Sequence, residues 1–114
     1  MIYHFCPEAT WAQAQHEGAY TADTLATEGF IHLSRAEQLH LPANALVRGR
    51  TDLVLLEVDE DLLPQPAVDE DGGDGMLFPH LYGPLPLDAV VAVHPFPPGR
   101  DGFFSLPRGL REAP

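Results

Sequence analysis

The chain has 114 residues, 45% of them hydrophobic, and 17 acidic residues against 6 basic ones give it a formal net charge of -11. This length suits one domain with one core, and the charge excludes long nucleic acid as a partner, because phosphate binding needs a basic surface. A small anion remains compatible with the sequence, since backbone N–H groups can hold a single phosphate.

Targeting and membrane signals are the next features that the sequence excludes. No hydrophobic run approaches the ~20 residues that cross a bilayer. The N-terminus lacks the pattern of a signal peptide, and a single cysteine cannot form an internal disulfide. We therefore expect a cytoplasmic protein.

The first third of the chain predicts two strands separated by helical segments. Residues 2–6 alternate in polarity as a strand does. Residues 7–18 begin with proline and end with glycine, which is typical of a helix. Residues 19–28 are polar and predict a loop with one helical turn. A second strand follows in "GFIHLS", residues 29–34.

A helical region is predicted after this second strand. Ser34 and Glu37 have the spacing of a capping box, in which two side chains satisfy the first N–H groups of a helix. Pro42 lacks an N–H and would clash inside a continuing helix, so we expect two helical pieces divided there. Gly49 is the predicted end of the second piece.

The second half predicts two central strands joined by a long loop. Residues 52–58 and 88–96 are rich in Val and Leu and look buried on both faces. The segment between them, including the acidic stretch 69–74, predicts an exposed and mobile loop with a short strand near Ala67 and Val68. We predict one domain over residues 1–98 and a partly disordered tail over residues 99–114.

Three histidines, His4, His32 and His80, lie inside hydrophobic runs. Histidine is suited to proton transfer near neutral pH, whereas a lone buried histidine is usually a core residue with both nitrogens bonded. Three such residues together favour a shared site. The spacings typical of metal, nucleotide-phosphate and serine-hydrolase motifs are absent, so we predict no metal site. Cys6 is a candidate nucleophile, but a small buried hydrophobic residue is the simpler interpretation.

The segment "FPHLYGPL" is rich in proline and glycine, which restrict the backbone. We interpret it as a rigid loop that presents His80 and Tyr82 as one wall of a cleft. The alternative is a buried turn that ends before the strand at Ala89.

The segments "IYHFCP", "TLATEGFIHLS" and "FPHLYGPLPLDAVVAV", with Trp11 between the first two, resemble the bacterial family called domain of unknown function 952. The resemblance covers residues 2–96. By fold, that family resembles a minimal relative of the ADP-ribosyltransferases and of the NAD-dependent RNA 2′-phosphotransferases. We therefore expect an α+β, ADP-ribosyltransferase-like domain with a bent or split antiparallel-rich sheet and two or three short helices.

The same resemblance implies catalytic roles for His4, His32 and Glu70. His4 would bind a ribose hydroxyl, His32 would orient the nicotinamide ribose, and Glu70 would stabilise an oxocarbenium-like transition state. The implied ligand-binding residues are Thr24, Glu28, Ser34, His80, Tyr82 and Gly83. No arginine that could hold a pyrophosphate is evident near the first strand.

NAD is therefore a candidate substrate, and the sequence points to no definite cofactor. The expected partner is a small molecule, such as a nucleotide, and neither a membrane nor long nucleic acid. Two alternatives stay open: a small-ligand binding protein without catalysis, and an interaction module whose histidines form a buried hydrogen-bond network. The sequence does not specify an oligomeric state.

Overall fold

The structure, a computed structural model, describes residues 1–105. These residues form three small antiparallel sheets and three short α-helices, which confirms the predicted α+β domain with a split sheet. The strands are β1 (Ile2–Pro7), β2 (Ala19–Tyr20), β3 (Ile31–His32), β4 (Leu53–Val58), β5 (Val68–Asp71), β6 (Leu77–Leu81), β7 (Leu85–Pro86) and β8 (Val90–Pro95). The helices are α1 (Glu8–Glu17), α2 (Asp23–Thr27) and α3 (His40–Leu46), with 3-10 turns η1 (Ala36–Gln38), η2 (Glu60–Leu62) and η3 (Leu87–Ala89).

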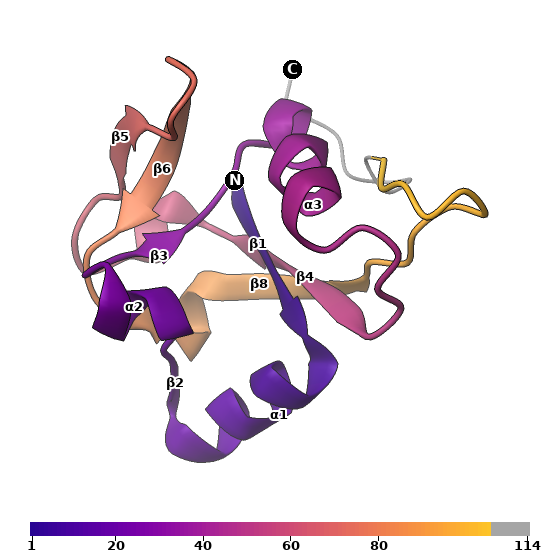
Figure 1. The fold of residues 1–114 in the computed structure, drawn as a ribbon. Coiled ribbons are helices and arrows are strands. Elements are labelled where there is room, and N and C mark those ends of the chain that lie inside the picture. Colours follow the sequence, from indigo (N-terminus) through magenta and orange to yellow (C-terminus); the bar gives the residue numbers. More distant parts are fainter. Residues whose placement is uncertain (106–114) are drawn as a thin grey trace.

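The largest sheet has the order β1-β4-β8 and lies between α1 and α3 (Figure 1). Strand β1 pairs with β4 from Ile2 opposite Val58 to Pro7 opposite Leu53. Successive strand residues face opposite sides, so the sheet contributes to two hydrophobic clusters. One cluster contains Ala14 of α1, and the other contains Ala43 of α3. Most of β4 is buried for this reason.

The prediction of two fully buried central strands is right for β4 and wrong for β8. In the described part of the chain β8 is an edge strand with a neighbour on one side only. Its residues alternate between half-buried and exposed, and Val91 and Val93 are 46% and 42% exposed. The hydrophobic run thus predicted the strand correctly. It did not predict how far the strand is buried, because burial depends on which other elements cover it.

Helix α1 follows the sequence prediction closely. Pro7 directly precedes it, and Gly18 ends it in the left-handed region (φ 87°), where the Gly18 N–H donates to the Ala14 carbonyl at 2.9 Å. Glycine is favoured there because it has no Cβ.

The predicted details around α3 need two corrections. The side-chain bond at the start of η1 runs from the Arg35 N–H to Gln38 Oε1 (2.9 Å), so the cap lies one residue later than the expected Ser34–Glu37 pair. Pro42 does not divide the helix either. It occupies the first turn of α3, where an N–H would have no partner within the helix.

The acidic segment forms a hairpin, so the short strand expected near Val68 is confirmed, but it extends to Asp71, where a mobile loop was expected. This segment is β5, and it pairs with β6 so that Glu70 lies opposite Phe78. The turn is organised by Asp71, whose Oδ1 accepts from the N–H groups of Gly73 (2.7 Å) and Gly75 (2.9 Å). The "FPHLYGPL" segment likewise begins inside β6 and is not wholly a loop.

Packed structure continues beyond residue 98. Phe104 is 4% exposed and belongs to the cluster on the α3 side of the sheet. Asn44 of α3 accepts from the Phe104 N–H (2.6 Å) and donates to its carbonyl (3.0 Å). Residues 106–114, the end of the predicted tail, lie outside the described residues. Among residues 1–105, no helix combines the length and hydrophobicity needed to cross a bilayer.

Candidate functional site

The two strands that carry His4 and His32 meet at one point. Tyr3 and Ser34 exchange two backbone hydrogen bonds of 2.8 Å in an isolated bridge. Ser34, an expected ligand-binding residue, is 5% exposed at this bridge. Beyond it the chains separate, and β3 pairs instead with β6, where His32 lies opposite His80. The three histidine-bearing strands are thereby brought together.

His4 has both ring nitrogens bonded inside the protein. Nδ1 lies 2.6 Å from the His32 carbonyl oxygen, and Nε2 lies 2.7 Å from the Tyr20 hydroxyl. Burial lowers the pKa of His4 to about 4, so the ring is neutral at pH 7. A carbonyl can only accept, so Nδ1 carries the proton and Nε2 accepts from Tyr20. A ribose hydroxyl at Nε2 would have to displace Tyr20.

Cys6 belongs to the same buried region as His4 and Tyr20. Its side chain is 3% exposed and packs in the cluster on the α1 side of the sheet. Burial raises the pKa of the Cys6 thiol to about 11, so the sulfur is protonated at neutral pH. Since the thiolate is the nucleophilic form, this geometry favours the interpretation of Cys6 as a buried hydrophobic residue.

His32 has a different environment, because its side chain is 48% exposed. Its Nε2 lies 3.2 Å from Glu28 Oε1, at the end of α2. The ring of Phe30 lies 4.8 Å from that of His32, and His80 meets His32 edge-on at 5.2 Å. The expected site residues Glu28, His32 and His80 are therefore neighbours.

His80 and Tyr82 converge on Glu70. His80 Nδ1 lies 2.9 Å from Glu70 Oε1, and the Tyr82 hydroxyl donates to the same oxygen at 2.6 Å. These two bonds, with Tyr82 the larger contribution, lower the pKa of the Glu70 carboxyl. Phe30 stacks on His80 with ring centroids 4.1 Å apart. Glu70 is thus held as a carboxylate by two side chains, His80 and Tyr82, that both lie against the ring of Phe30.

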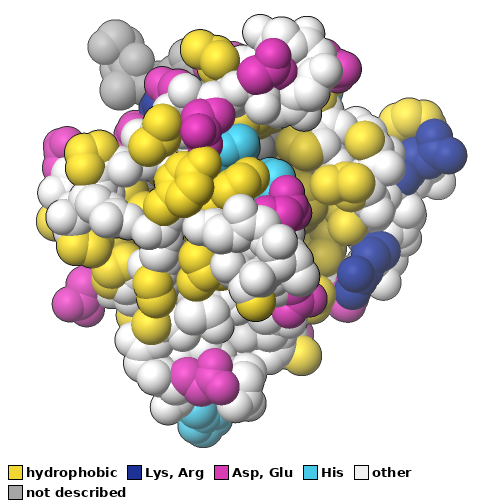
Figure 2. All heavy atoms as spheres, turned by 60° about the vertical axis from the view of Figure 1, so that its left-hand side comes forward, with side chains coloured by type: hydrophobic (Ala, Val, Ile, Leu, Met, Phe, Trp, Pro, Cys, Tyr) yellow, Lys and Arg dark blue, Asp and Glu magenta, His cyan; other side chains and the backbone are white. Residues whose placement is uncertain are grey.

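We call this surface the histidine face and define it by the residues Glu28, Phe30, His32, Glu70, His80 and Tyr82. Figure 2 shows histidine side chains among hydrophobic and acidic ones on the side of the molecule that lies to the left in Figure 1. Two buried side-chain atoms of the described residues lack a hydrogen-bond partner, His80 Nε2 and Thr24 Oγ1. Buried polar atoms usually have partners, so both have unused hydrogen-bonding capacity, although neither atom is exposed at the surface.

The remaining expected residue, Gly83, has a local structural role. A Cβ at this position would lie 3.2 Å from Gln65 Nε2, which donates to the Tyr82 carbonyl. Gly83 therefore leaves room for the contact that fixes the backbone of Tyr82. Within residues 1–105, no group of three His, Cys, Asp or Glu side chains could hold a metal ion.

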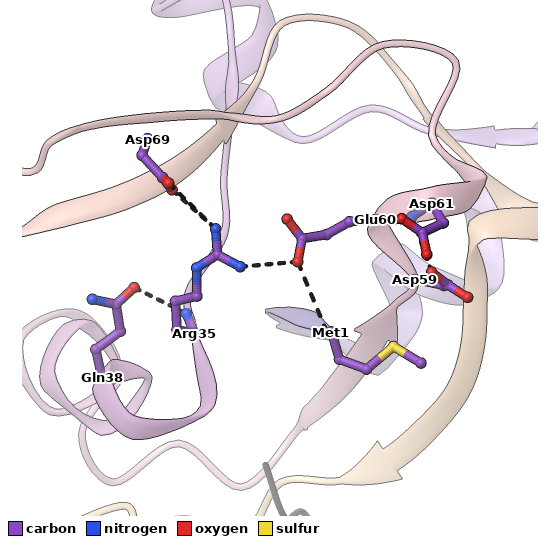
Figure 3. Close-up of polar contacts among 7 residues, drawn as sticks. All are labelled: Met1, Arg35, Gln38, Asp59, Glu60, Asp61 and Asp69. Carbon is purple, nitrogen blue, oxygen red and sulfur yellow. Dashed lines mark hydrogen bonds and ion pairs between the residues drawn. The ribbon is translucent and has the colours of Figure 1, made fainter. Parts of the chain in front are cut away.

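Arg35 lies a few residues after β3, but its guanidinium is already paired (Figure 3). Nη1 lies 2.9 Å from Glu60 Oε2, and Nη2 lies 3.1 Å from Asp69 Oδ1. The Met1 amino nitrogen lies 3.9 Å from the same Glu60 oxygen. Arg35 thus connects η2 with β5 next to Glu70, and a phosphate would have to compete with two carboxylates for it.

A surface hollow of about 310 Å³ lies between α1 and β2, away from most of the histidine face. It is lined by Ala9, Thr10, Gln13, Ala14, Glu17, Tyr20 and Thr21. Tyr20 links this hollow to His4, because its hydroxyl bonds to His4 Nε2.

Two residues of this region were not predicted from the sequence. Phe30 carried a usable signal, because it lies two residues before His32 and so on the same face of an extended chain. Tyr20 carried none, because its contact with His4 spans 16 residues and depends on the pairing of β2 with β7.

Comparisons with known proteins cover most of this domain. A protein-family model described as "Protein of unknown function (DUF952)" matches residues 5–93. Two crystal structures of protein CC0527 from Caulobacter crescentus are similar to this chain. The sequence of the first is 34% identical, and that of the second, a double mutant, is 33% identical. Both have a TM-score of 0.84 and cover 92% of this chain and 93% of that one. The solution NMR structure of CC0527 is 34% identical to this chain and has a TM-score of 0.80. The match covers 92% of this chain and 91% of that one. No curated protein matches.

Proposed function

Since this chain belongs to the DUF952 family, we propose from its histidine face that it is a transferase of ADP-ribosyltransferase type, with NAD as substrate. The comparisons name no activity, so the support comes from the site itself. The observation that carries the proposal is the Glu70 carboxylate, fixed by Tyr82 at 2.6 Å and by His80 at 2.9 Å, the residue on which the ring of Phe30 stacks.

The chemistry of NAD suits such a surface. Its nicotinamide ring is cationic, and aromatic faces and carboxylates attract cations. When the bond between nicotinamide and the ribose C1′ breaks, the electron pair stays on the nicotinamide nitrogen, which becomes neutral. Positive charge then develops on the ribose, and a carboxylate held in place stabilises it. Glu70 is the residue proposed for this role.

The other residues take supporting roles in the proposal. The acceptor attacks C1′ and loses a proton, which the exposed His32 with Glu28 beside it would take up. His80 Nε2 and Thr24 Oγ1 have unused hydrogen-bonding capacity, and the ligand would reach them only if the side chains around them moved. His4 does not contact the ligand in this arrangement, because its two nitrogens bond to Tyr20 and His32.

The test is nicotinamide release from NAD, measured with water and with a 2′-phosphorylated RNA oligonucleotide as acceptors. We expect Glu70→Gln to lower kcat by about 100-fold or more, while the dissociation constant for NAD changes far less. Glu8→Gln, which removes an exposed carboxylate from α1, should leave both unchanged. Absence of release above the protein-free rate, together with absence of NAD binding, would refute the proposal.

A binding protein without catalysis is the second candidate, and the internal bonding of His4 favours it. In that case NAD, ADP-ribose or a phosphorylated nucleotide at 100 times its dissociation constant would raise the stability by about 2.7 kcal/mol. The Glu70→Gln variant would then lose this stabilisation, with no turnover in either protein.

A further inference from the structure

Strand β3 is joined to the central sheet by few hydrogen bonds, although Ile31 is buried in the same hydrophobic cluster as Ile2 of β1. It has only two residues, Ile31 and His32, and its pairing partner is β6 of the same small sheet. Its chain is joined to β1 by the isolated bridge between Tyr3 and Ser34. The next contact between them is the bond from His4 Nδ1 to the His32 carbonyl.

We propose that Tyr20 is a positioning residue for the histidine face, acting through His4 on the main chain of His32. The geometry is a chain of two short hydrogen bonds, 2.7 Å from the Tyr20 hydroxyl to His4 Nε2 and 2.6 Å from His4 Nδ1 to the His32 oxygen. The catalytic consequence rests on the proposed function, but the structural consequence does not.

The direction of both bonds follows from the donors available. A neutral imidazole has one N–H and one acceptor nitrogen. With Tyr20 donating to Nε2, the proton of His4 resides on Nδ1, where it faces the carbonyl. In the other tautomer, the Nδ1 lone pair would face the lone pairs of the His32 oxygen. The His32 carbonyl therefore selects the tautomer with the proton on Nδ1, and the Tyr20 hydroxyl stabilises that tautomer by donating to Nε2.

Tyr20 is itself held firmly. It is 3% exposed, and its backbone pairs with Leu85 of β7. Burial raises the pKa of Tyr20, with a smaller contribution from Cys6, so the hydroxyl keeps its proton as a donor. The same backbone segment at His32 carries the imidazole that meets Glu28 and His80. A shift of the His32 carbonyl would consequently move the imidazole relative to both.

The test is Tyr20→Phe, which keeps the ring and removes the hydroxyl, with Val54→Ala as the control. Val54 is 8% exposed and packs in the same cluster, but its hydrocarbon side chain makes no hydrogen bond. By NMR, we expect Tyr20→Phe to change the His4 15N shifts and the His32 carbonyl 13C shift, and Val54→Ala to leave them unchanged. Under the proposed function, Tyr20→Phe should also lower kcat by about 10-fold with little change in NAD affinity.

A second pair of variants keeps the proposal testable if Tyr20→Phe fails to fold. The amide nitrogen of His4→Asn can replace Nδ1 as a donor to the His32 carbonyl, whereas His4→Leu cannot. We expect the Asn variant to retain the wild-type carbonyl shift and the Leu variant to lose it.

Unchanged His4 and His32 signals in Tyr20→Phe, with a loss of stability equal to that of Val54→Ala, would overturn the proposal. Equal carbonyl shifts in the two His4 variants would overturn it as well. If wild type releases no nicotinamide, the proposed function fails, while the NMR comparison still decides the role of Tyr20.

Discussion

His4 and His80 both lie on strands among hydrophobic residues, yet their surroundings differ. His4 has partners at both nitrogens, Tyr20 and the His32 carbonyl. His80 has one partner, Glu70, while its Nε2 is buried without one. The first arrangement is complete within the protein, and the second has capacity for an added group. The same sequence pattern thus contains a structural histidine and a candidate ligand-binding histidine.

The difference follows from where the two strands lie. Strand β1 belongs to the sheet between α1 and α3, where neighbouring elements supply partners from both sides. Strand β6 belongs to the small sheet with the acidic hairpin, in which Val68 and Leu77 are 46% and 55% exposed. Within β6, however, Pro79, His80 and Leu81 are buried, and His80 Nε2 lies there without a hydrogen-bond partner.

The largest expected effect would come from removing His4. His4→Ala should lower the free energy of unfolding by about 3 kcal/mol, because it leaves the Tyr20 hydroxyl and the His32 carbonyl without this partner and creates a cavity. His32→Ala should cost less than about 0.5 kcal/mol, since that side chain is 48% exposed. Urea unfolding followed by circular dichroism measures both. Equal losses would remove the distinction between the two environments.

The second prediction concerns the pH dependence of stability that follows from the buried environment of His4. The pKa of His4 is about 4 in the folded protein and 6.5 when unperturbed. Well above pH 6.5 the His4 ring is neutral in both the folded and the unfolded state, so it contributes nothing to the pH dependence of stability. Between pH 6.5 and 4 mainly the unfolded state binds the proton. The free energy of unfolding therefore decreases as the pH is lowered, by up to about 1.4 kcal/mol per pH unit from this group.

Urea titrations at pH 7, 6 and 5 on wild type and His4→Asn measure this contribution. The carboxylates are common to both proteins, so the difference between their slopes isolates His4. Parallel slopes would show that the His4 ring takes up its proton as readily in the folded as in the unfolded state.

Arg35 tests whether the small sheet depends on the rest of the domain. Arg35→Gln should lower stability by about 1 kcal/mol, because the guanidinium connects η2 with β5 through Glu60 and Asp69. Arg50→Gln is the matched control, since Arg50 pairs with Asp52 only two residues away and should contribute almost nothing. Both can be measured at low and high salt, and the loss for Arg35 should shrink as salt screens the pairs. Identical losses for the two variants would contradict this connection.

The smallest effect on stability is expected from Tyr82→Phe, an exposed position. Its hydroxyl donates to Glu70 and contributes most to the lowered pKa of that carboxyl. The variant should therefore raise the pKa of Glu70 toward its ordinary value, measured by a 13C NMR titration of the carboxyl. An unchanged pKa would mean that His80 alone holds the carboxylate.

The sequence was sufficient to predict features that depend on neighbouring residues. Alternation in residues 2–6 predicted β1, and Pro7 with Gly18 predicted the limits of α1. It could not predict which strands lie at an edge, because the exposure of Val91 depends on distant elements. A short strand was predicted near Val68, but its extension through the acidic residues to Asp71 was not, because the pairing with β6 outweighs their low strand propensity.

The same limit applies to the candidate site. His32, Glu70, His80 and Tyr82 were chosen from the sequence, and the structure places them on one face. The partners of His4 were not predictable, because one is a main-chain carbonyl and the other a tyrosine in a segment without any pattern.

The pairing of β1 with β4 has a consequence for how this chain is made. Ile2 pairs with Val58, so β1 has no partner strand from β4 until about 50 further residues have been synthesised. At roughly 5–20 residues per second, this delay is about 3–10 s. During that interval the polar groups of the β1 backbone have no sheet to join, and "IYHFC" is a hydrophobic segment open to chaperones. The central sheet can close only after nascent β4 has emerged, so a stall in translation before residue 58 would leave the β1 strand unprotected.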